Sequence, residues 1–242
     1  MTPLPFCLLG CVNYERARQL QLRLIEEIYC QNLPGILLLL EHPHVFTLGK
    51  AATRKHILVS DEVLRREGIE VYSVERGGDI TYHGPGQIVG YPLVNLSLWN
   101  KDVHLYLRSL EEVIIQFLRR FEMFAFRLPP HTGVWMNKNQ PEKIAAIGVA
   151  VKKWVTYHGF AFNIATDLKY FSYIIPCGIR DKGVTSLEKV YGKRFSLIER
   201  EEFNRSLVED FSRVFGFQMV EMDSQPLKKW IAGDVNTVTS DQ

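Results

Sequence analysis

The sequence predicts an α+β fold in one domain. Strand-like apolar stretches and segments with helical periodicity are interspersed along the 242 residues. They do not alternate as regular βαβ units, which argues against a doubly wound parallel sheet. No linker, repeat or low-complexity segment divides the chain. We therefore expect one domain over residues 1–232, followed by a polar, flexible C-terminal tail over residues 233–242.

Four segments have signals of helices, either the spacing of an amphipathic helix or a capping residue at the start. In the first of them, Leu20 and Leu24 belong to an apolar series at helical spacing. In the last, Ser196 and Glu199 have the spacing of a capping box at the helix start. Helices are therefore expected at residues 13–32, 61–67, 102–121 and 197–215.

Apolar stretches without helical spacing predict strands. A first strand is expected before Cys11, and further strands at residues 35–41, 69–74 and 88–96.

Residues 144–151 and 154–163 are typical of a hairpin with a two-lysine turn. That register places Gly148 opposite Tyr157 and gathers small residues into one patch, a slot in which a linear apolar group could lie against the backbone. Close packing of a helix or sheet would favour the same residues. In this register Lys143 lies on the opposite face of the hairpin from the slot. We therefore expect either a bulge in the strand or a Lys143 side chain that reaches the slot from the end of the strand.

Composition and charge exclude several classes of protein. Hydrophobic residues make up 46% and charged residues 23% of the chain, which is ordinary for a soluble globular protein. The net charge is +2 and the cations are spread beside nearly as many acids, so we expect no nucleic-acid partner. The longest apolar run, residues 35–40, is too short to cross a bilayer, so we expect no membrane partner. The four cysteines match no zinc-ligand spacing, which indicates free thiols, no metal and a cytoplasmic location.

Two histidines stand close together in residues 41–49. His42 and His44 could suggest a metal site, but Pro43 lies between them and no third ligand is near in the sequence. A structural loop is the favoured interpretation.

A glycine-rich segment spans residues 76–87. Its four glycines would let the backbone pass close to a ligand, or would serve only the torsions of two tight turns around a short strand. It fits neither the Walker phosphate loop nor the dinucleotide fingerprint. The polar side chains of Arg76, Thr81, His83 and Gln87 favour a binding site.

Cys177 lies between Pro176 and Gly178, which predicts a turn rather than a helix or regular strand. A loop cysteine followed by glycine can present a thiolate and a backbone N–H to one substrate atom, as acyl transfer requires. A small buried side chain in a connection is the alternative. Lys143, taken alone, would be a solvated residue at a strand end.

Together these segments resemble the lipoyl(octanoyl) transferase family. The resemblance covers about residues 12–215, and several motifs occur in the family's order. They are Arg76-Gly77-Gly78, Thr81, His83, Pro85-Gly86-Gln87, Tyr91-Pro92, Gly133-Val134-Trp135, residues 143–148, residues 159–163, Pro176-Cys177-Gly178 and Val184-Thr185-Ser186.

The resemblance implies a mixed β-sheet flanked by helices, the fold shared with biotin and lipoate protein ligases. It implies transfer of an octanoyl or lipoyl group from acyl carrier protein to a lysine of apo lipoyl domains, in lipoate biosynthesis. The expected acceptors are 2-oxoacid dehydrogenase E2 subunits and the glycine cleavage H protein. The expected enzyme is a monomer that needs no cofactor, because its thioester donor is already activated.

The resemblance also assigns roles to residues. Cys177 corresponds to the nucleophile that carries the acyl group as a thioester, and Lys143 to the residue that lowers the pKa of that cysteine. The expected acyl-binding residues are Arg76, Gly77, Gly78, Asp79, Ile80, Thr81, Tyr82, His83, Ala146, Ile147, Gly148, Gly159, Phe160 and Ala161.

Three other functions fit parts of the pattern. An ATP-dependent lipoate protein ligase shares the fold and the lysine but would not need Cys177. A thioesterase would use the same acyl-enzyme with water as acceptor. A non-catalytic lipoyl-domain or acyl-binding module would bind without turnover.

Overall fold

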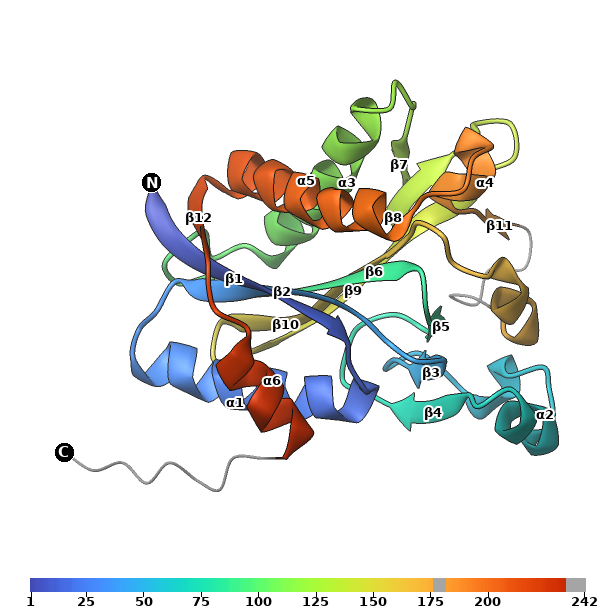
Figure 1. Ribbon diagram of the computed structural model, residues 1–242, viewed down its shortest axis with the longest axis horizontal. Coiled ribbons are helices and arrows are strands. Elements are labelled where there is room, and N and C mark those ends of the chain that lie inside the picture. Colours follow the sequence, from blue (N-terminus) through green and yellow to red (C-terminus); the bar gives the residue numbers. More distant parts are fainter. Residues whose placement is uncertain (176–181, 234–242) are drawn as a thin grey trace.

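A computed structural model describes residues 1–175 and 182–233, and its centre is one large mixed sheet (Figure 1). The strands of this sheet are β1 (Thr2–Cys11), β2 (Gly35–Glu41), β6 (Gln87–Val94), β7 (Phe126–Leu128), β8 (His131–Met136), β9 (Glu142–Lys152), β10 (Val155–Asn163), β11 (Gly183–Val184) and β12 (Phe217–Glu221). Within the described residues they pair in the order β12-β1-β2-β6-β10-β9-β8-β7, with β11 added beside β9. β1 runs parallel to β2 and β12, whereas β2, β6, β10, β9 and β8 are antiparallel neighbours.

Helices cover both faces of the large sheet (Figure 1). The helices are α1 (Tyr14–Cys30), α2 (Asp61–Arg66), α3 (Val103–Arg119), α4 (Leu187–Tyr191), α5 (Leu197–Phe215) and α6 (Gln225–Ala232). α3 and α5 bury one face of the sheet, and α1 with α6 covers the other. The expected α+β architecture with a flanked mixed sheet is confirmed.

Local sequence signals set the helix ends. The Asn13 side chain accepts hydrogen bonds from the first backbone N–H groups of α1, and Asp102 does the same for α3. The expected capping box of Ser196 and Glu199 is present at the start of α5, and Gly216 ends that helix at φ 74°.

A second, three-stranded sheet lies beside the first. It consists of β4 (Glu70–Ser73), β3 (Val45–Leu48) and β5 (Ile80–His83), in that order. Residues 45–48 were expected in a loop, and that expectation is wrong: Phe46 is fully buried in the core of this sheet. The sequence does not mark this strand, because both its faces are buried and apolar and polar residues do not alternate along it.

The hairpin of β9 and β10 has a different register from the expected one. Its turn residues are Lys153 and Trp154, both with positive φ, and Gly148 lies opposite Gly159 rather than Tyr157. The register differs by two residues, so each side chain keeps its expected face. The sequence lacks the Asn or Gly that usually marks such a turn.

A bulge in β9 turns Lys143 over. Lys143 pairs with Trp135, but Ala145 pairs with Val134, so Ile144 is an extra residue on this strand. Lys143 therefore shares a face with Ala146 instead of opposing it. Of the two arrangements that the sequence left open, the bulge is the one present.

Candidate active site

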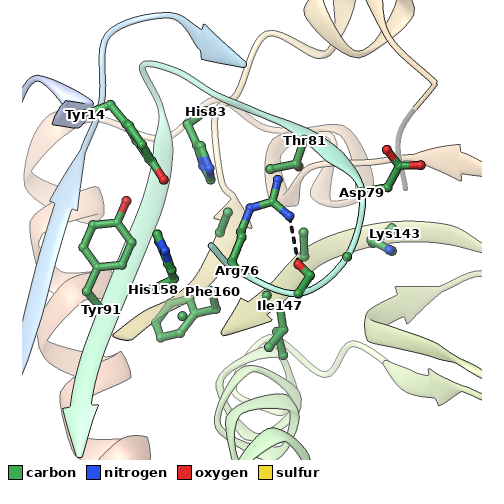
Figure 2. A pocket seen from close by; sticks show the side chains of 16 residues that line it. Tyr14, Arg76, Asp79, Thr81, His83, Tyr91, Lys143, Ile147, His158 and Phe160 are labelled. Atoms are coloured by element: carbon green, nitrogen blue, oxygen red, sulfur yellow. Dashed lines mark hydrogen bonds between the residues drawn. The ribbon is translucent and has the colours of Figure 1, made fainter. Parts of the chain in front are cut away.

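A cavity lies between the β9–β10 hairpin and the glycine-rich segment that leads into β5 (Figure 2). All but two of the expected acyl-binding residues line it, namely Arg76, Gly77, Gly78, Asp79, Thr81, His83, Ala146, Ile147, Gly148, Gly159, Phe160 and Ala161. Residues from two distant parts of the sequence thus form one site.

Ile80 and Tyr82 are the two exceptions. Side chains alternate along β5, so Thr81 and His83 face the cavity while Ile80 and Tyr82 pack into the core of the small sheet. The Tyr82 hydroxyl lies 2.8 Å from Nδ1 of His44. The side chains of Ile80 and Tyr82 therefore support the cavity wall from behind.

Glycines shape two walls of the cavity. We call the glycine-rich residues 76–79 the roof, and the lining residues of β9 and β10 the floor. A Cβ added to Gly148 would lie 3.0 Å from the Gly77 carbonyl oxygen, and one added to Gly159 would lie 2.1 Å from the carbonyl oxygen of Gly90. The Gly77 N–H donates to the Val149 oxygen at 2.9 Å, which fastens the roof to β9. The space between roof and floor is therefore a slot bounded largely by backbone.

Arg76 braces the roof. Its Nη2 donates to the Thr47 carbonyl oxygen at 2.6 Å and to the Thr47 hydroxyl at 2.9 Å, and its Nη1 donates to the Gly77 oxygen at 3.0 Å (Figure 2). These bonds tie the glycine-rich segment to β3. The apolar part of Arg76 adds to the cavity lining.

Lys143 lies at one end of the cavity and is 8% exposed (Figure 2). Its Nζ sits 4.8 Å from the centre of the buried Trp135 ring, a cation–π contact. Its Cε would lie 3.4 Å from a Cβ at Gly133, so glycine there leaves room for the lysine stem. Behind Gly133, the buried carboxylate of Glu111 accepts the Gly133 N–H at 3.0 Å.

Cys177 lies outside the described residues, as do Pro176 and Gly178. The described residues on either side of this stretch are held near Lys143 and Asp79. Ile175 N–H donates to the His56 oxygen at 2.9 Å, and Nδ1 of His56 lies 2.7 Å from the Asp79 carboxylate. After the stretch, β11 pairs with the start of β9 at Lys143.

The other end of the cavity is polar. Tyr14, His83, Tyr91 and His158 converge there, far from Lys143 (Figure 2). Burial lowers the pKa of His158 to about 4 and that of His83 well below its usual value, so both rings are neutral at pH 7. Except for His83, these residues were not predicted for the site. The signal available for Tyr91 and His158 was a polar ring inside a largely apolar strand.

Comparison with known sequences decides the family. Residues 13–212 match the family model "Lipoyl protein ligase A/B catalytic domain". The octanoyltransferase of Caldicellulosiruptor bescii is 47% identical over 212 residues, covering 87% of this chain and 90% of its own. The chain belongs to the octanoyltransferase family. The expected resemblance and the expected acyltransferase class are confirmed.

Solved structures with low identity share the fold of this octanoyltransferase family member. The bipartite lipoate protein ligase of Thermoplasma acidophilum matches with a TM-score of 0.71 at 17% identity, over 97% of this chain and 92% of the other. Biotin protein ligase from Aquifex aeolicus matches with a TM-score of 0.51 at 16% identity, over 89% and 71% of the two chains. The expected likeness to the lipoate and biotin ligase fold is confirmed.

The other three cysteines of this octanoyltransferase family member do not line the cavity. Cys7 is buried, whereas Cys11 and Cys30 are exposed. Over the described ranges, no three His, Cys, Asp or Glu side chains are grouped to hold a metal ion. No helix in those ranges is long and apolar enough to span a membrane.

Proposed function

We propose that this acyltransferase moves an octanoyl or lipoyl group from acyl carrier protein to a lysine of an apo lipoyl domain, through a thioester on Cys177. Octanoyl transfer in lipoate biosynthesis follows from the family. The observation that best supports the rest is the bulge in β9, which turns Lys143 into the slot beside the segment that continues to Cys177. A backbone-lined slot ending at an ammonium group suits an apolar chain with a reactive carbonyl at the lysine end.

The proposed reaction has two exchanges. In the first, the Cys177 thiolate attacks the donor carbonyl, the carbonyl–sulfur bond to the carrier breaks, and the Lys143 ammonium gives its proton to the leaving carrier thiolate. In the second, the acceptor lysine's amine attacks the acyl-enzyme, an amide bond forms, Cys177 leaves as thiolate and neutral Lys143 takes the amine's proton. The second exchange returns to Lys143 the proton that the first exchange used, and in the resting enzyme the ammonium form of Lys143 favours the Cys177 thiolate.

We further propose E2 subunits of 2-oxoacid dehydrogenases and the glycine cleavage H protein as acceptors, and a monomeric enzyme. The thioester donor supplies the activation, so the reaction as proposed consumes no ATP.

Intact-mass analysis of the full chain mixed with octanoyl-acyl carrier protein tests the nucleophile. We expect one octanoyl adduct in the wild type and none in Cys177→Ser. The exposed thiols offer matched controls, because Cys11→Ser and Cys30→Ser should keep the adduct. An adduct retained in Cys177→Ser contradicts the assignment.

The same mixture separates the competing functions. Transfer that requires ATP and free lipoate would indicate a ligase, and release of octanoate without an acceptor protein would indicate a thioesterase. Binding of the donor without any turnover would indicate a binding module. We expect transfer to an apo lipoyl domain without ATP, and at least a hundredfold loss of rate in Lys143→Ala, the usual scale for a general acid–base residue.

A further inference from the structure

We infer that the end of the cavity opposite Lys143 is a subsite for a hydrogen-bonding group at the far end of the acyl chain. The ligand class is a medium-chain acyl thioester that carries a hydroxyl or carbonyl oxygen near its distal terminus. This inference rests on the proposed function, since it takes the reacting carbonyl to lie at Lys143. Tyr14, Tyr91 and His158 form the subsite (Figure 2).

Tyr14 presents a hydroxyl with no partner. It is 2% exposed, and within the described part of the chain no hydrogen bond involves this hydroxyl. Its ring is fixed by stacking on Tyr72, at 5.5 Å between ring centroids, and on His83, at 6.0 Å. A rigid phenol at the cavity end can donate to a ligand without first giving up another bond.

His158 is held in place by a strained backbone. Its φ is +56°, a left-handed conformation inside strand β10. Its N–H donates to Oε1 of Gln21 at 2.7 Å, a buried side chain of α1. Left-handed residues of this size are uncommon and persist where the surroundings enforce them. The hydrogen bond to Gln21 holds His158 in this conformation.

The ring of His158 is buried without a hydrogen-bond partner among the described residues, although the residue is only 2% exposed. The Glu75 carboxylate lies 3.7 Å from its Nε2, too long for a hydrogen bond. A buried polar atom without a partner costs free energy, so such an atom beside a cavity indicates a ligand atom that completes it.

Tyr91 supplies an acceptor. Nδ1 of His42 donates to the Val12 oxygen at 2.6 Å, which leaves Nε2 of His42 to accept the Tyr91 O–H at 2.7 Å. Tyr91 lines the cavity, and its hydroxyl oxygen has no other hydrogen-bond partner among the described residues. Tyr14 can therefore donate to a distal oxygen, and Tyr91 can accept from a distal hydroxyl. His83 is different, because its Nδ1 already donates to Gln87 at 2.9 Å.

A chain that ends in a methyl group would leave these polar atoms without partners, whereas a distal oxygen would satisfy them. Binding of the octanoyl chain therefore leaves these polar atoms without hydrogen-bond partners, which costs free energy. The subsite thus predicts a particular tolerance: an octanoyl group with a terminal hydroxyl should be transferred about as well as octanoyl itself. An apolar end wall would instead reject the hydroxyl.

The test compares kcat/KM for octanoyl- and 8-hydroxyoctanoyl-acyl carrier protein with an apo lipoyl domain as acceptor. In the wild type we expect the two values to agree within about tenfold, because the hydroxyl exchanges water for protein partners. In Tyr14→Phe and in His158→Asn, kcat/KM for the hydroxyoctanoyl donor divided by kcat/KM for the octanoyl donor should fall about fivefold to tenfold. This is the effect of losing one hydrogen bond. Asn is chosen at position 158 because it tolerates the left-handed backbone.

Tyr72→Phe is the matched control. It removes a tyrosine hydroxyl from the outer side of the same aromatic stack, where that hydroxyl donates to Glu70 at 3.0 Å, and the ratio should not change. Thermal unfolding verifies that each variant is folded. A wild type that prefers octanoyl by more than tenfold, or a ratio unchanged in both Tyr14→Phe and His158→Asn, overturns the subsite. Failure of octanoyl transfer itself would instead overturn the proposed function.

Discussion

At the scale of single residues, the slot depends on positions where the backbone comes too close for a side chain. Gly159 is the tightest of these in the cavity floor, because β10 crosses the Gly90 carbonyl of β6 at a distance that excludes a Cβ. Gly77, in the roof, has more room, since a Cβ there would meet only the Val149 oxygen at 3.6 Å. The two glycines of one cavity therefore differ in what they tolerate.

Gly159→Ala should destabilise the protein by about 2 kcal/mol, the usual cost of overpacking a core, because two central strands would have to separate. Gly77→Ala is the control and should cost less than about 0.5 kcal/mol, as at an unconstrained position. Urea unfolding at pH 7.5 measures both. Equal losses in the two variants would contradict this reading of the cavity floor.

Single residues also mark the limit of what could be predicted. Arg76, Gly77 and the other motif residues were found because they are close in sequence and unusual in type. Tyr14 and His158 were not found, because they come from α1 and β10 and meet only when helix and sheet pack together. Nothing in the sequence marks the buried bond that Gln21 makes to the His158 backbone.

At the scale of elements, α3 holds the wall behind Lys143. The Glu111 carboxylate is fully buried at the start of β8, where it accepts from Gly133 N–H, from Arg108 at 2.7 Å and from Arg127 at 3.0 Å. Through Gly133 this network fixes the space that the Lys143 stem occupies. A helix on one face of the sheet thereby positions a residue of the slot.

Glu111→Leu should cost about 3 kcal/mol, as expected when a buried, bonded charge is removed and its partners remain. It should also lower kcat/KM for octanoyl transfer, because Gly133 loses its acceptor. Glu111→Gln keeps an acceptor oxygen and should recover most of the rate. Denaturant unfolding and steady-state kinetics measure the two effects.

Glu112→Leu is the comparison for this prediction. Glu112 is partly exposed and pairs with Arg127 at 2.7 Å, so its loss should cost less than about 1 kcal/mol. Indistinguishable results for Glu111→Leu and Glu112→Leu would show that burial of the carboxylate carries no extra effect.

Elements with strong local signals were predicted well. The capping box and periodicity placed α5 at residues 197–215, as observed. The expected β9–β10 turn was placed one residue too early, because Lys153 and Trp154 adopt positive φ without a glycine or asparagine to mark them. The bulge at Ile144 depends on pairing with β8, which no local pattern reports. The six residues that include Cys177 lie outside the described residues, so that assignment stays a prediction.

At the scale of the whole molecule, neutral histidines are buried where the two sheets meet. Burial lowers the pKa of His42 and of His158 to about 4, and that of His83 well below its usual value. Arg76 and Arg18 lower the pKa of His158 further, whereas Glu75 raises it. In the unfolded chain these rings titrate near 6.5.

Stability should therefore fall as the pH drops from about 6.5 to about 4, because the unfolded state takes up protons that the folded state refuses. Each histidine contributes a slope of about 1.4 kcal/mol per pH unit in this window. Above pH 6.5 the rings are neutral in both states and contribute no slope. Urea unfolding between pH 7.5 and 4.5 should show this decline.

His158→Asn should reduce the slope of the unfolding free energy against pH by the contribution of one histidine, roughly 1.4 kcal/mol per pH unit. His104→Asn, at an exposed position on α3, is the control and should leave the slope as it is. A slope that is the same in His158→Asn and wild type would show that the buried ring takes up its proton without unfolding.

The pairing of β1 bears on how the chain folds during synthesis. The first half of β1, from Thr2 to Phe6, pairs on one side with β12, residues 217–221, and from Phe6 onward its other side pairs with β2. On the ribosome, β2 emerges within a few seconds at typical elongation rates of about 5–20 residues per second, whereas β12 follows some two hundred residues later. Until then the outer edge of β1 remains an open template for pairing with another strand. Among the described strands, the one made first is completed by the one made last, so this edge stays unpaired until β12 has been synthesised.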